Sequence, residues 1–443
     1  MVVHSALHPY TGHAPESAGA RREDTFGAVL RARAAAHPAR LALVAPPAGR
    51  GTARRTWTYA ALDRRADRLA AGLAARGIRR GDRVVVQLPR TPEFFETAFA
   101  LFRTGAVPVF APASPSRREL SALLSATRAV ALVTSGAAGG APVAGPALAA
   151  AARAHAPSVR HVFVAGGDPG YFESLAEVSA EPGELPGPSA GDLAFLQYAG
   201  AGTLAPRLVP RSHGDHLRLL RAAGQAGGLD GRSVHLCVPD QGPDPLLASP
   251  GPLAVLCAGG RVVLAPDASP DTGFRLIESE QVTVTGLSAA TARVWTEAAP
   301  HTAYDISGLR VLQVIGGRLG EEAARRVRPA LGCSLQQVFG TPEGLLTCTR
   351  LDDSPETVAT TQGRPVGHGD ELRVVDDQDN ELPPGCTGHV LARGPHIADA
   401  YWNDSAGRPR AFTRDGFHRT GRTGRLTGSG HLVIEGDADR AGA

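Results

Sequence analysis

The segment from Leu193 to His213 carries the residues best suited to bind phosphate. A strand-like run leads into a loop of small residues, Ala199 to Pro206, and then into Arg207 and a polar stretch able to begin a helix. Small residues let backbone N–H groups approach phosphate oxygens, while a hydroxyl and a cation supply further contacts. The loop matches neither GxxxxGK[ST] nor GxGxxG, so these residues alone favour an ordinary surface turn.

Other groups of reactive side chains give weaker indications of a functional site. His213 and His216 form an HxxH pair that lacks a third ligand, so we interpret them as a surface pair at the start of a helix rather than as a metal site. No GxSxG motif is present to anchor a serine hydrolase. The five cysteines are widely spaced without a CxxC pair, which favours buried reduced thiols over zinc ligands or disulfides. They are Cys237, Cys257, Cys333, Cys348 and Cys386.

The charge of the chain is balanced. Its 46 basic and 43 acidic residues are mixed along the sequence, which argues against a nucleic-acid partner, and every basic residue is arginine. Any mechanism that requires a lysine amine must therefore take it from another molecule. No apolar run reaches the roughly 20 residues of a membrane span, and the N-terminus lacks a signal pattern. We expect a cytoplasmic protein without a membrane contact.

The elements that would position these residues alternate between strand and helix. Thr58 is predicted to cap a helix whose apolar residues recur every three or four positions and which ends at Gly77. Further helices are predicted at 93–103 and 320–331. Strands are predicted at 84–88, 106–110, 130–134, 161–165, 234–238, 261–264, 282–286 and 310–315, followed by shorter ones at 371–375 and 388–392 and a hairpin at 425–436. The pattern predicts an α/β fold with two doubly wound subdomains and a small β-rich one.

The predicted organisation follows from these elements. We expect a mobile leader, a surface excursion between Ser135 and Ala156, three ordered regions and a short C-terminal hinge. The ranges are 1–24 for the leader, 25–190 for the first α/β subdomain, 191–334 for the second with its phosphate-loop-like segment, 335–436 for the β-rich subdomain and 437–443 for a truncated hinge.

A series of segments in fixed order resembles the adenylate-forming superfamily, and most closely the free-standing aryl-acid–AMP ligases such as the 2,3-dihydroxybenzoate–AMP ligases of siderophore pathways. The segments are 55–89, 193–213, 248–271, 311–317, 335–353, 361–367 and 415–426. The resemblance covers nearly all of residues 25–436. It implies the large N-terminal lobe of that fold, with two α/β subdomains and a β-barrel-like one. It also implies that a carboxylic acid attacks the α-phosphate of ATP, with Mg²⁺, to form an acyl-AMP that is passed to a carrier protein.

The resemblance also implies roles for individual residues. Arg207 and Glu343 would be catalytic, and Thr203 and Glu343 would hold the metal. The residues expected to bind the nucleotide are Gly200, Gly202, Thr203, Gly316, Gly317, Phe339, Gly340, Thr341 and Arg422. The residues expected to bind the acid are Asp240, Gln241, Gly242, Ser249 and Ile315. Asp240, Gln241 and Asp244 serve equally well as solvent-facing turn residues.

The chain departs from the family pattern at several of these positions. In the phosphate loop, Ala199 and Gly202 replace serines, Leu204 replaces a glycine, and Arg207 replaces a lysine, a change that is not conservative at a phosphate. Arg422 stands where an aspartate binds the ribose hydroxyls, and arginine has donors only. The hinge pattern GRxKD corresponds here to residues 436–440, with three charges reversed. The histidine and asparagine of the dihydroxybenzoate pocket are missing.

Two functional hypotheses follow. The first is an acid–AMP ligase acting on an aryl acid in siderophore or secondary-metabolite biosynthesis. Because the family's mobile C-terminal lobe and its lysine do not follow residue 443, this hypothesis expects a separate protein to supply the lobe, or a mechanism that does not need it. The alternative is a binding or scaffold protein, or a different acyl-transfer chemistry, on the same fold.

Overall fold

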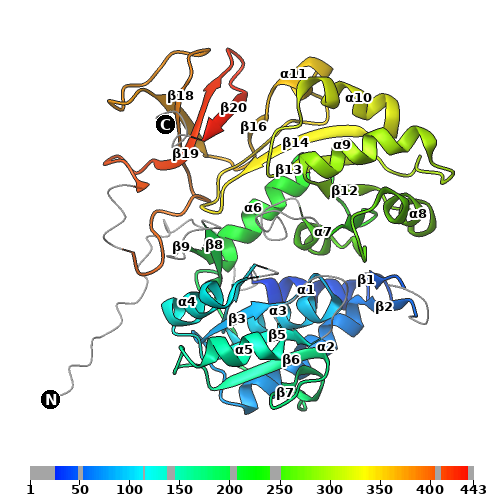
Figure 1. The fold of residues 1–443 in the computed structure, drawn as a ribbon, viewed down its shortest axis with the longest axis vertical. Coiled ribbons are helices and arrows are strands. Elements are labelled where there is room, and N and C mark those ends of the chain that lie inside the picture. The colour runs from blue at the N-terminus through cyan, green and yellow to red at the C-terminus, as the bar shows by residue number, and fades with distance from the viewer. Residues whose placement is uncertain are drawn as a thin grey trace.

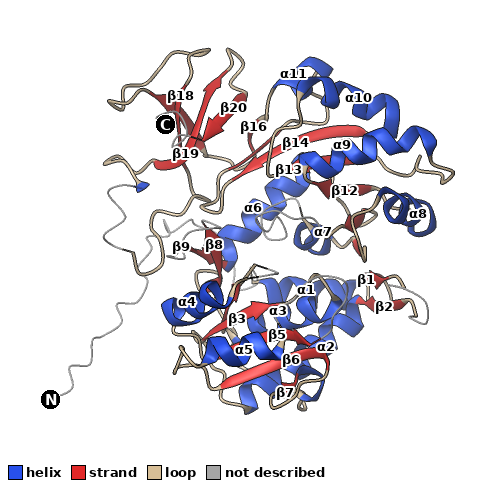
Figure 2. Cartoon of the chain, viewed as in Figure 1, coloured by secondary structure: helices blue, strands red, loops and turns tan. Residues whose placement is uncertain are grey.

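The structure, a computed structural model, describes residues 25–47, 53–112, 115–136, 145–199, 207–239, 251–404 and 411–437. It contains two large sheets covered by helices and one small antiparallel sheet (Figures 1 and 2). In the view of Figure 1, the first large sheet lies at the bottom, the second at the upper right and the small sheet at the upper left. The predicted α/β architecture is confirmed.

The first large sheet has seven strands. Its spatial order is β7 (Glu173–Ser174), β6 (His161–Gly167), β5 (Ala131–Gly136), β3 (Arg83–Gln87), β4 (Val107–Phe110), β8 (Leu193–Ala199) and β9 (Arg207–Ser212). All neighbours are parallel except β8 and β9, which form an antiparallel pair. Valine-rich strands such as β3 suit this position, because a parallel sheet is covered on both faces.

The second large sheet has nine strands. Its spatial order is β16 (Arg364–Pro365), β15 (Leu346–Cys348), β14 (Ser334–Gly340), β13 (Val311–Ile315), β12 (Val284–Leu287), β10 (Val234–Cys237), β11 (Arg261–Leu264), β1 (Leu41–Ala45) and β2 (Arg55–Thr58). The strands from β14 to β1 are parallel, and antiparallel strands extend both ends.

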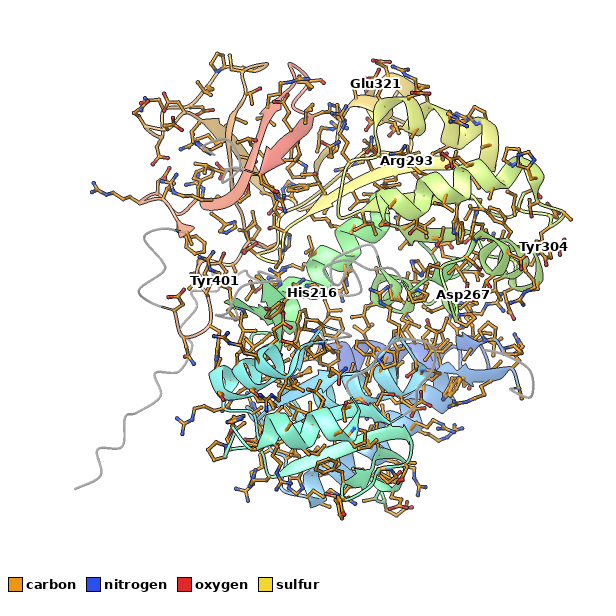
Figure 3. All side chains as sticks on the ribbon, in the orientation of Figure 1. His216, Asp267, Arg293, Tyr304, Glu321 and Tyr401 are labelled. Atoms are coloured by element: carbon orange, nitrogen blue, oxygen red, sulfur yellow. The ribbon has the colours of Figure 1, made fainter. Side chains whose placement is uncertain are left out.

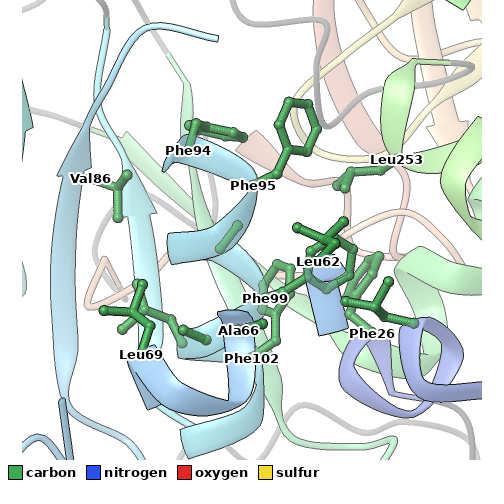
Figure 4. Packing of buried hydrophobic residues seen from close by; sticks show 14 of the residues in the cluster. Phe26, Leu62, Ala66, Leu69, Val86, Phe94, Phe95, Phe99, Phe102 and Leu253 are labelled. Atoms are coloured by element: carbon green, nitrogen blue, oxygen red, sulfur yellow. The ribbon is translucent and has the colours of Figure 1, made fainter. Parts of the chain in front are cut away.

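The two sheets share one hydrophobic core. Val84 and Val86 of β3 face a cluster that also contains Val262 of β11, whereas Val85, one residue along, faces the opposite side of its sheet. This alternation, with period two, places a layer of helices between the sheets. That layer contains α1 (Phe26–Ala36), α2 (Tyr59–Ala75), α3 (Pro92–Thr104), α6 (His213–Ala226) and α7 (Pro252–Ala258). Figure 4 shows its phenylalanines, including Phe26 and Phe102.

Helices also cover the outer face of each large sheet. The seven-stranded sheet is covered by α4 (Arg117–Thr127) and α5 (Pro146–Arg153), and the nine-stranded sheet by α8 (Pro270–Glu280), α9 (Ala289–Ala298), α10 (Glu321–Leu331) and α11 (Pro355–Thr360). Short 3₁₀ turns occur at Leu175–Glu177 and Ala299–His301. The described chain therefore has five layers, two sheets alternating with three layers of helices.

The small sheet packs beside the carboxyl end of β14. Its order is β17 (Glu371–Val375), β18 (Gly388–Arg393), β19 (His418–Leu426) and β20 (Leu432–Asp437), all antiparallel. Over its described residues this unit is an open sheet rather than a barrel, because its edge strands β17 and β20 do not pair with each other. Phe339 of β14 joins its core together with Val390 and Leu432.

Two details differ from the sequence expectations, and a third lies outside the described residues. The sheets do not follow the ranges 25–190, 191–334 and 335–436, because β1 and β2 pair with β11 in the second sheet, β8 and β9 belong to the first, and β14 to β16 complete the second. The expected surface excursion at 135–156 contains α5, whose Ala149 and Ala152 are buried against the first sheet. Residues 1–24 and 438–443 of the expected leader and hinge lie outside the described residues.

The predicted cap at Thr58 is present, since its hydroxyl accepts a hydrogen bond from the Ala61 N–H over 3.1 Å at the start of α2. Within the described part of the chain, no helix combines the length and the apolar composition needed to cross a bilayer.

Candidate active site

Arg207 lies at the start of β9, where it is directly opposite Ala199 of β8. The expected phosphate loop thus connects two antiparallel strands, and β9 separates it from helix α6. The Arg207 guanidinium is exposed and stands over the ring of Tyr401, with 5.6 Å between the guanidinium carbon and the ring centroid. Arg207 therefore offers a positive charge beside the loop and beside Tyr401.

Glu343 is presented by a tight turn that follows β14. The Thr341 N–H donates to the carbonyl of Leu345 over 2.9 Å, and the Gly344 N–H donates back to the carbonyl of Thr341 over 3.0 Å. Gly344 has φ +116°, and a Cβ at this position would collide with the carbonyl of His396 and the guanidinium of Arg211. The turn therefore requires glycine next to the glutamate.

The Glu343 carboxylate is buried, with 7% of the residue exposed. The Tyr401 hydroxyl donates to its Oε1 over 2.7 Å and lies 3.2 Å from Nε2 of His418, which is itself 3.7 Å from Oε1. Burial is the main factor that raises the pKa of Tyr401, and burial also lowers the pKa of His418. The cluster is thus a carboxylate held by a protonated phenol beside a neutral imidazole. We call Arg207, Glu343, Tyr401 and His418 the Glu343 cluster.

Arg211 forms hydrogen bonds to the backbone beside this cluster. Its guanidinium is almost fully buried and donates to the carbonyls of Glu343, over 3.1 Å, and of His396, over 2.8 Å. Burial raises the pKa of the nearby Asp370 carboxyl to about 6, and the charge of Arg211 opposes that rise. Burial and the charge of Arg211 also lower the pKa of His396 to about 4. A buried cation therefore links β9 to the turn that carries Glu343.

The oxygen atoms at this turn fit Mg²⁺. Both described contacts of the Glu343 carboxylate fall on Oε1, and the hydroxyl of Thr341 is buried without a hydrogen-bond partner among the described residues. Mg²⁺ takes hard oxygen ligands and is commonly held by one or two carboxylates together with substrate phosphates and water. In the described residues no group of three or more His, Cys, Asp or Glu side chains could hold a metal alone. Glu343 and Thr341 are therefore the side chains of this turn that would offer oxygen ligands to Mg²⁺ if it binds beside a nucleotide.

The expected nucleotide residues of β13 and β14 lie at neighbouring carboxyl ends. Ile315 pairs with Val338 across the two strands, and a Cβ added to the following Gly316, with φ +80°, or to Gly317 would meet no heavy atom within 4 Å. Gly340 ends β14. Ligands of open α/β sheets bind outside such carboxyl ends. Phe339 points instead into the apolar cluster with the small sheet, so it packs the subdomains together.

Arg422 lies apart from these residues, on β19. It forms an ion pair with Asp437, its direct partner on β20, and both side chains are 44% exposed. None of its described contacts reaches the Glu343 cluster. Of the other expected site residues, Gly200, Gly202, Thr203, Asp240, Gln241, Gly242 and Ser249 lie outside the described residues, as do Leu204 and Asp244.

The surface interpretation of His213 and His216 is wrong. They do begin α6, but both are buried, and their rings contact Phe26, with His216 also against Phe195. The reason is that α6 belongs to the middle layer, where even its first turn is covered from both sides. A helix start is exposed in isolation, and here Phe26 of α1, Phe102 of α3 and Phe195 of β8 cover it.

Sequence reasoning missed the side chains that hold Glu343, namely Tyr401, His418 and Arg211. Tyr401 lies in an irregular segment and carried no motif. Only a weak signal in the sequence indicated Arg211. It is four residues from Arg207 and two from Val209, so in a strand all three lie on one face. Arg211 comes from the seven-stranded sheet, His418 from the small sheet and Tyr401 from an irregular segment, and no local spacing encodes these contacts.

The fold and this site define the class of protein. Residues 30–402 match the family model described as AMP-binding enzyme, and the chain belongs to that family. The lobe matches the apo structure of MbtA from Mycobacterium smegmatis with a TM-score of 0.86 and 39% identity, over 95% of this chain and 77% of that one. The predicted resemblance to the adenylate-forming fold is confirmed.

Curated relatives sharpen this assignment. The chain is 44% identical to a 2,3-dihydroxybenzoate-AMP ligase from Bacillus subtilis, over 94% of this chain and 75% of the relative. It is 40% identical to a salicyl-AMP ligase / salicyl-S-ArCP synthetase from Mycobacterium tuberculosis, over 93% of this chain and 73% of the relative. The likeness to aryl-acid–AMP ligases noted in the sequence is therefore confirmed.

Proposed function

We propose that this protein activates an aryl carboxylic acid as an acyl-AMP, with ATP and Mg²⁺, and passes the acyl group to the thiol of a carrier protein in siderophore or related biosynthesis. The observation that carries the proposal is the Glu343 cluster. In it a buried carboxylate is linked through Tyr401 to an arginine, and in the same turn the Thr341 hydroxyl has no partner among the described residues, at the carboxyl edge of an AMP-binding fold. That arrangement suits a reaction in which the protein positions phosphates and neutralises their charge.

In the proposed reaction these residues position the phosphates and neutralise their charge. A carboxylate oxygen of the acid attacks the α-phosphorus, the bond to the bridging oxygen breaks, and pyrophosphate leaves with the electron pair. Bound Mg²⁺ supplies charge neutralisation on the phosphates. Glu343 and Thr341 hold oxygen ligands ready at the turn, and Arg207 adds a cation from the opposite sheet. Arg207 pairs with phosphate through a planar fork, unlike the ammonium that the family uses there.

The acid is proposed as an aryl acid because the relatives named above are ligases of 2,3-dihydroxybenzoate and of salicylate. The segment expected to read the ring, residues 240–249, lies outside the described residues and lacks the histidine and asparagine of the dihydroxybenzoate pattern. We therefore propose the class of acid and not one member of it. The carrier thiol as acceptor follows from the activity for which the salicyl-S-ArCP synthetase is named.

A second candidate function is nucleotide or acyl-adenylate binding without turnover. The Arg422–Asp437 pair favours it, because arginine cannot accept hydrogen bonds from ribose hydroxyls. The substituted phosphate loop favours it too, since two serine hydroxyls are replaced. In this case the protein would act as a scaffold that retains the fold of the ligases.

The test is acid-dependent exchange of labelled pyrophosphate into ATP over a panel of aryl and aliphatic acids. We expect exchange with an aryl acid, reduced about 100-fold by Glu343→Gln, in line with the loss of one charge-stabilising group in other enzymes. Glu322→Gln is the matched control, because Glu322 is an exposed carboxylate on α10. Exchange that is equal in both variants would remove Glu343 from the mechanism.

Calorimetry with ATP and with AMP separates the two candidates. Binding of either nucleotide without exchange, with and without added candidate carrier or lobe proteins, supports the binding protein. Exchange by the isolated chain supports the ligase and leaves the separate lobe unnecessary for this half-reaction.

A further inference from the structure

Tyr401 is the residue at which the three sheets meet. Arg207 reaches it from β9 of the seven-stranded sheet, Glu343 from the turn after β14 of the nine-stranded sheet, and His418 from the first position of β19 in the small sheet. Figure 3 labels Tyr401 near the junction of these elements. The ring is buried and also faces Phe412, with 6.0 Å between ring centroids.

The hydrogen bonds of the Tyr401 hydroxyl have one consistent direction. A carboxylate only accepts, so the phenolic proton lies toward Oε1 of Glu343. The phenolic oxygen can then accept from Nε2–H of a neutral His418, 3.2 Å away. The Nδ1 of His418 is buried without a described partner, so this tautomer leaves it as a bare acceptor. The hydrogen bonds thus run from His418 to Tyr401 and from Tyr401 to Glu343, where they end on a single carboxylate oxygen, Oε1.

The consequence for Glu343 is a fixed orientation. Oε1 carries both described contacts, which leaves Oε2 as the oxygen available to a metal. A buried carboxylate without a donor would turn toward water or toward another cation, because an unpaired buried charge is costly. Groups that orient a metal ligand in this way typically change metal affinity by 10-fold to 100-fold when they are removed.

We propose that Tyr401 is a positioning residue that holds Glu343 in its metal-binding orientation and makes that orientation depend on the docking of all three sheets. This inference rests on the proposed function for the identity of the metal and the nucleotide. Tyr401 itself touches neither. Movement of the small sheet, which carries His418, would loosen the same hydrogen bonds and thereby weaken the metal site.

The test is binding of Mn²⁺, as a spectroscopic substitute for Mg²⁺, in the presence of ATP and the absence of acid. Free Mn²⁺ is followed by electron paramagnetic resonance in a titration of the full chain. Tyr401→Phe keeps the ring beneath Arg207 and removes only the hydroxyl. We expect Mn²⁺ binding about tenfold weaker than in the wild type. Tyr171→Phe, at a fully exposed tyrosine, is the matched control and should bind as the wild type does.

The outcomes separate this inference from the proposed function. Equal Mn²⁺ affinity in the wild type and Tyr401→Phe overturns the positioning role and leaves the ligase proposal standing. Weaker binding in the variant supports the role even if the protein exchanges no pyrophosphate. A wild type that binds no Mn²⁺ with ATP overturns both. Thermal unfolding without ligand checks that the variant is folded, and if it is not, the same titration on His418→Gln decides, with weaker binding again expected.

Discussion

The Glu343 cluster and the Arg422–Asp437 pair both bring charged groups together, but they differ in burial. Glu343, Tyr401 and His418 are each less than a tenth exposed and come from different parts of the chain, whereas Arg422 and Asp437 are 44% exposed neighbours on one hairpin. Buried hydrogen bonds to charged groups stabilise by about 1.5–3 kcal/mol, and exposed ion pairs by about 0–1 kcal/mol. The buried region is therefore constrained by the fold, while the exposed pair is free to change its charges.

The largest effect is expected at Arg211, the buried cation behind the cluster. Arg211→Met would leave Asp370 without its nearby cation and would remove one hydrogen bond from each of the carbonyls of Glu343 and His396. We expect a loss of about 3–5 kcal/mol in the free energy of unfolding, measured by urea denaturation. Arg326→Met, at an exposed position of α10, is the control. A loss below about 1 kcal/mol at Arg211 would mean that burial does not distinguish the two regions.

The same contrast extends to histidines and predicts a pH dependence. Burial lowers the pKa of His213 from 6.5 to about 4, and the charge of Asp192 opposes that fall. The folded state therefore keeps the imidazole neutral, and between pH 6.5 and 4 only the unfolded chain binds the proton. The contribution of this group to the free energy of unfolding is complete above pH 6.5. It decreases by about 3 kcal/mol as the pH drops to 4.

Urea titrations at several pH values measure that slope. His213→Gln should reduce it, because the variant has no imidazole to protonate at this position. An unchanged slope in His213→Gln would show that other groups account for the acid sensitivity.

At the exposed pair, a smaller effect is expected on binding rather than on stability. The double variant Arg422→Asp with Asp437→Arg keeps an ion pair across β19 and β20 and restores an acceptor at position 422. We expect ATP affinity to rise about tenfold in calorimetry, with little change in melting temperature. Arg422→Asp alone should lower the melting temperature slightly, because two carboxylates then face each other. Unchanged affinity in the double variant would place the ribose away from this hairpin.

The smallest effect is expected at the cysteines. Burial raises the pKa of Cys257 and Cys333 to about 12 and of Cys348 to about 11, and Cys237 is also buried, whereas Cys386 is exposed. A thiol reagent should therefore modify about one thiol rapidly in the native protein and all of them after denaturation. Cys386→Ser should remove the rapid phase and change stability by no more than about 0.5 kcal/mol.

Much of the fold was predictable because its signals are local. The apolar period in α2, the cap at Thr58 and the valine runs of β3 and β11 each lie within a few residues of one another. The expectation of buried thiols holds for Cys237, Cys333 and Cys348 but not for Cys386, which lies in a loop of the small sheet. A motif singled out Glu343 as a candidate, but no motif indicated the side chains that contact it, because they lie 58 and 75 residues further along the chain.

The sequence by itself determined the α/β class, the likeness to AMP-forming ligases and the use of arginine in place of every lysine, because these are properties of residue type, order and short-range spacing. The tertiary structure alone decided which strands share a sheet, that His213 and His216 are buried, and that Tyr401 joins three sheets at Glu343. Those facts depend on contacts between segments far apart in the chain, and such contacts arise only when the layers pack.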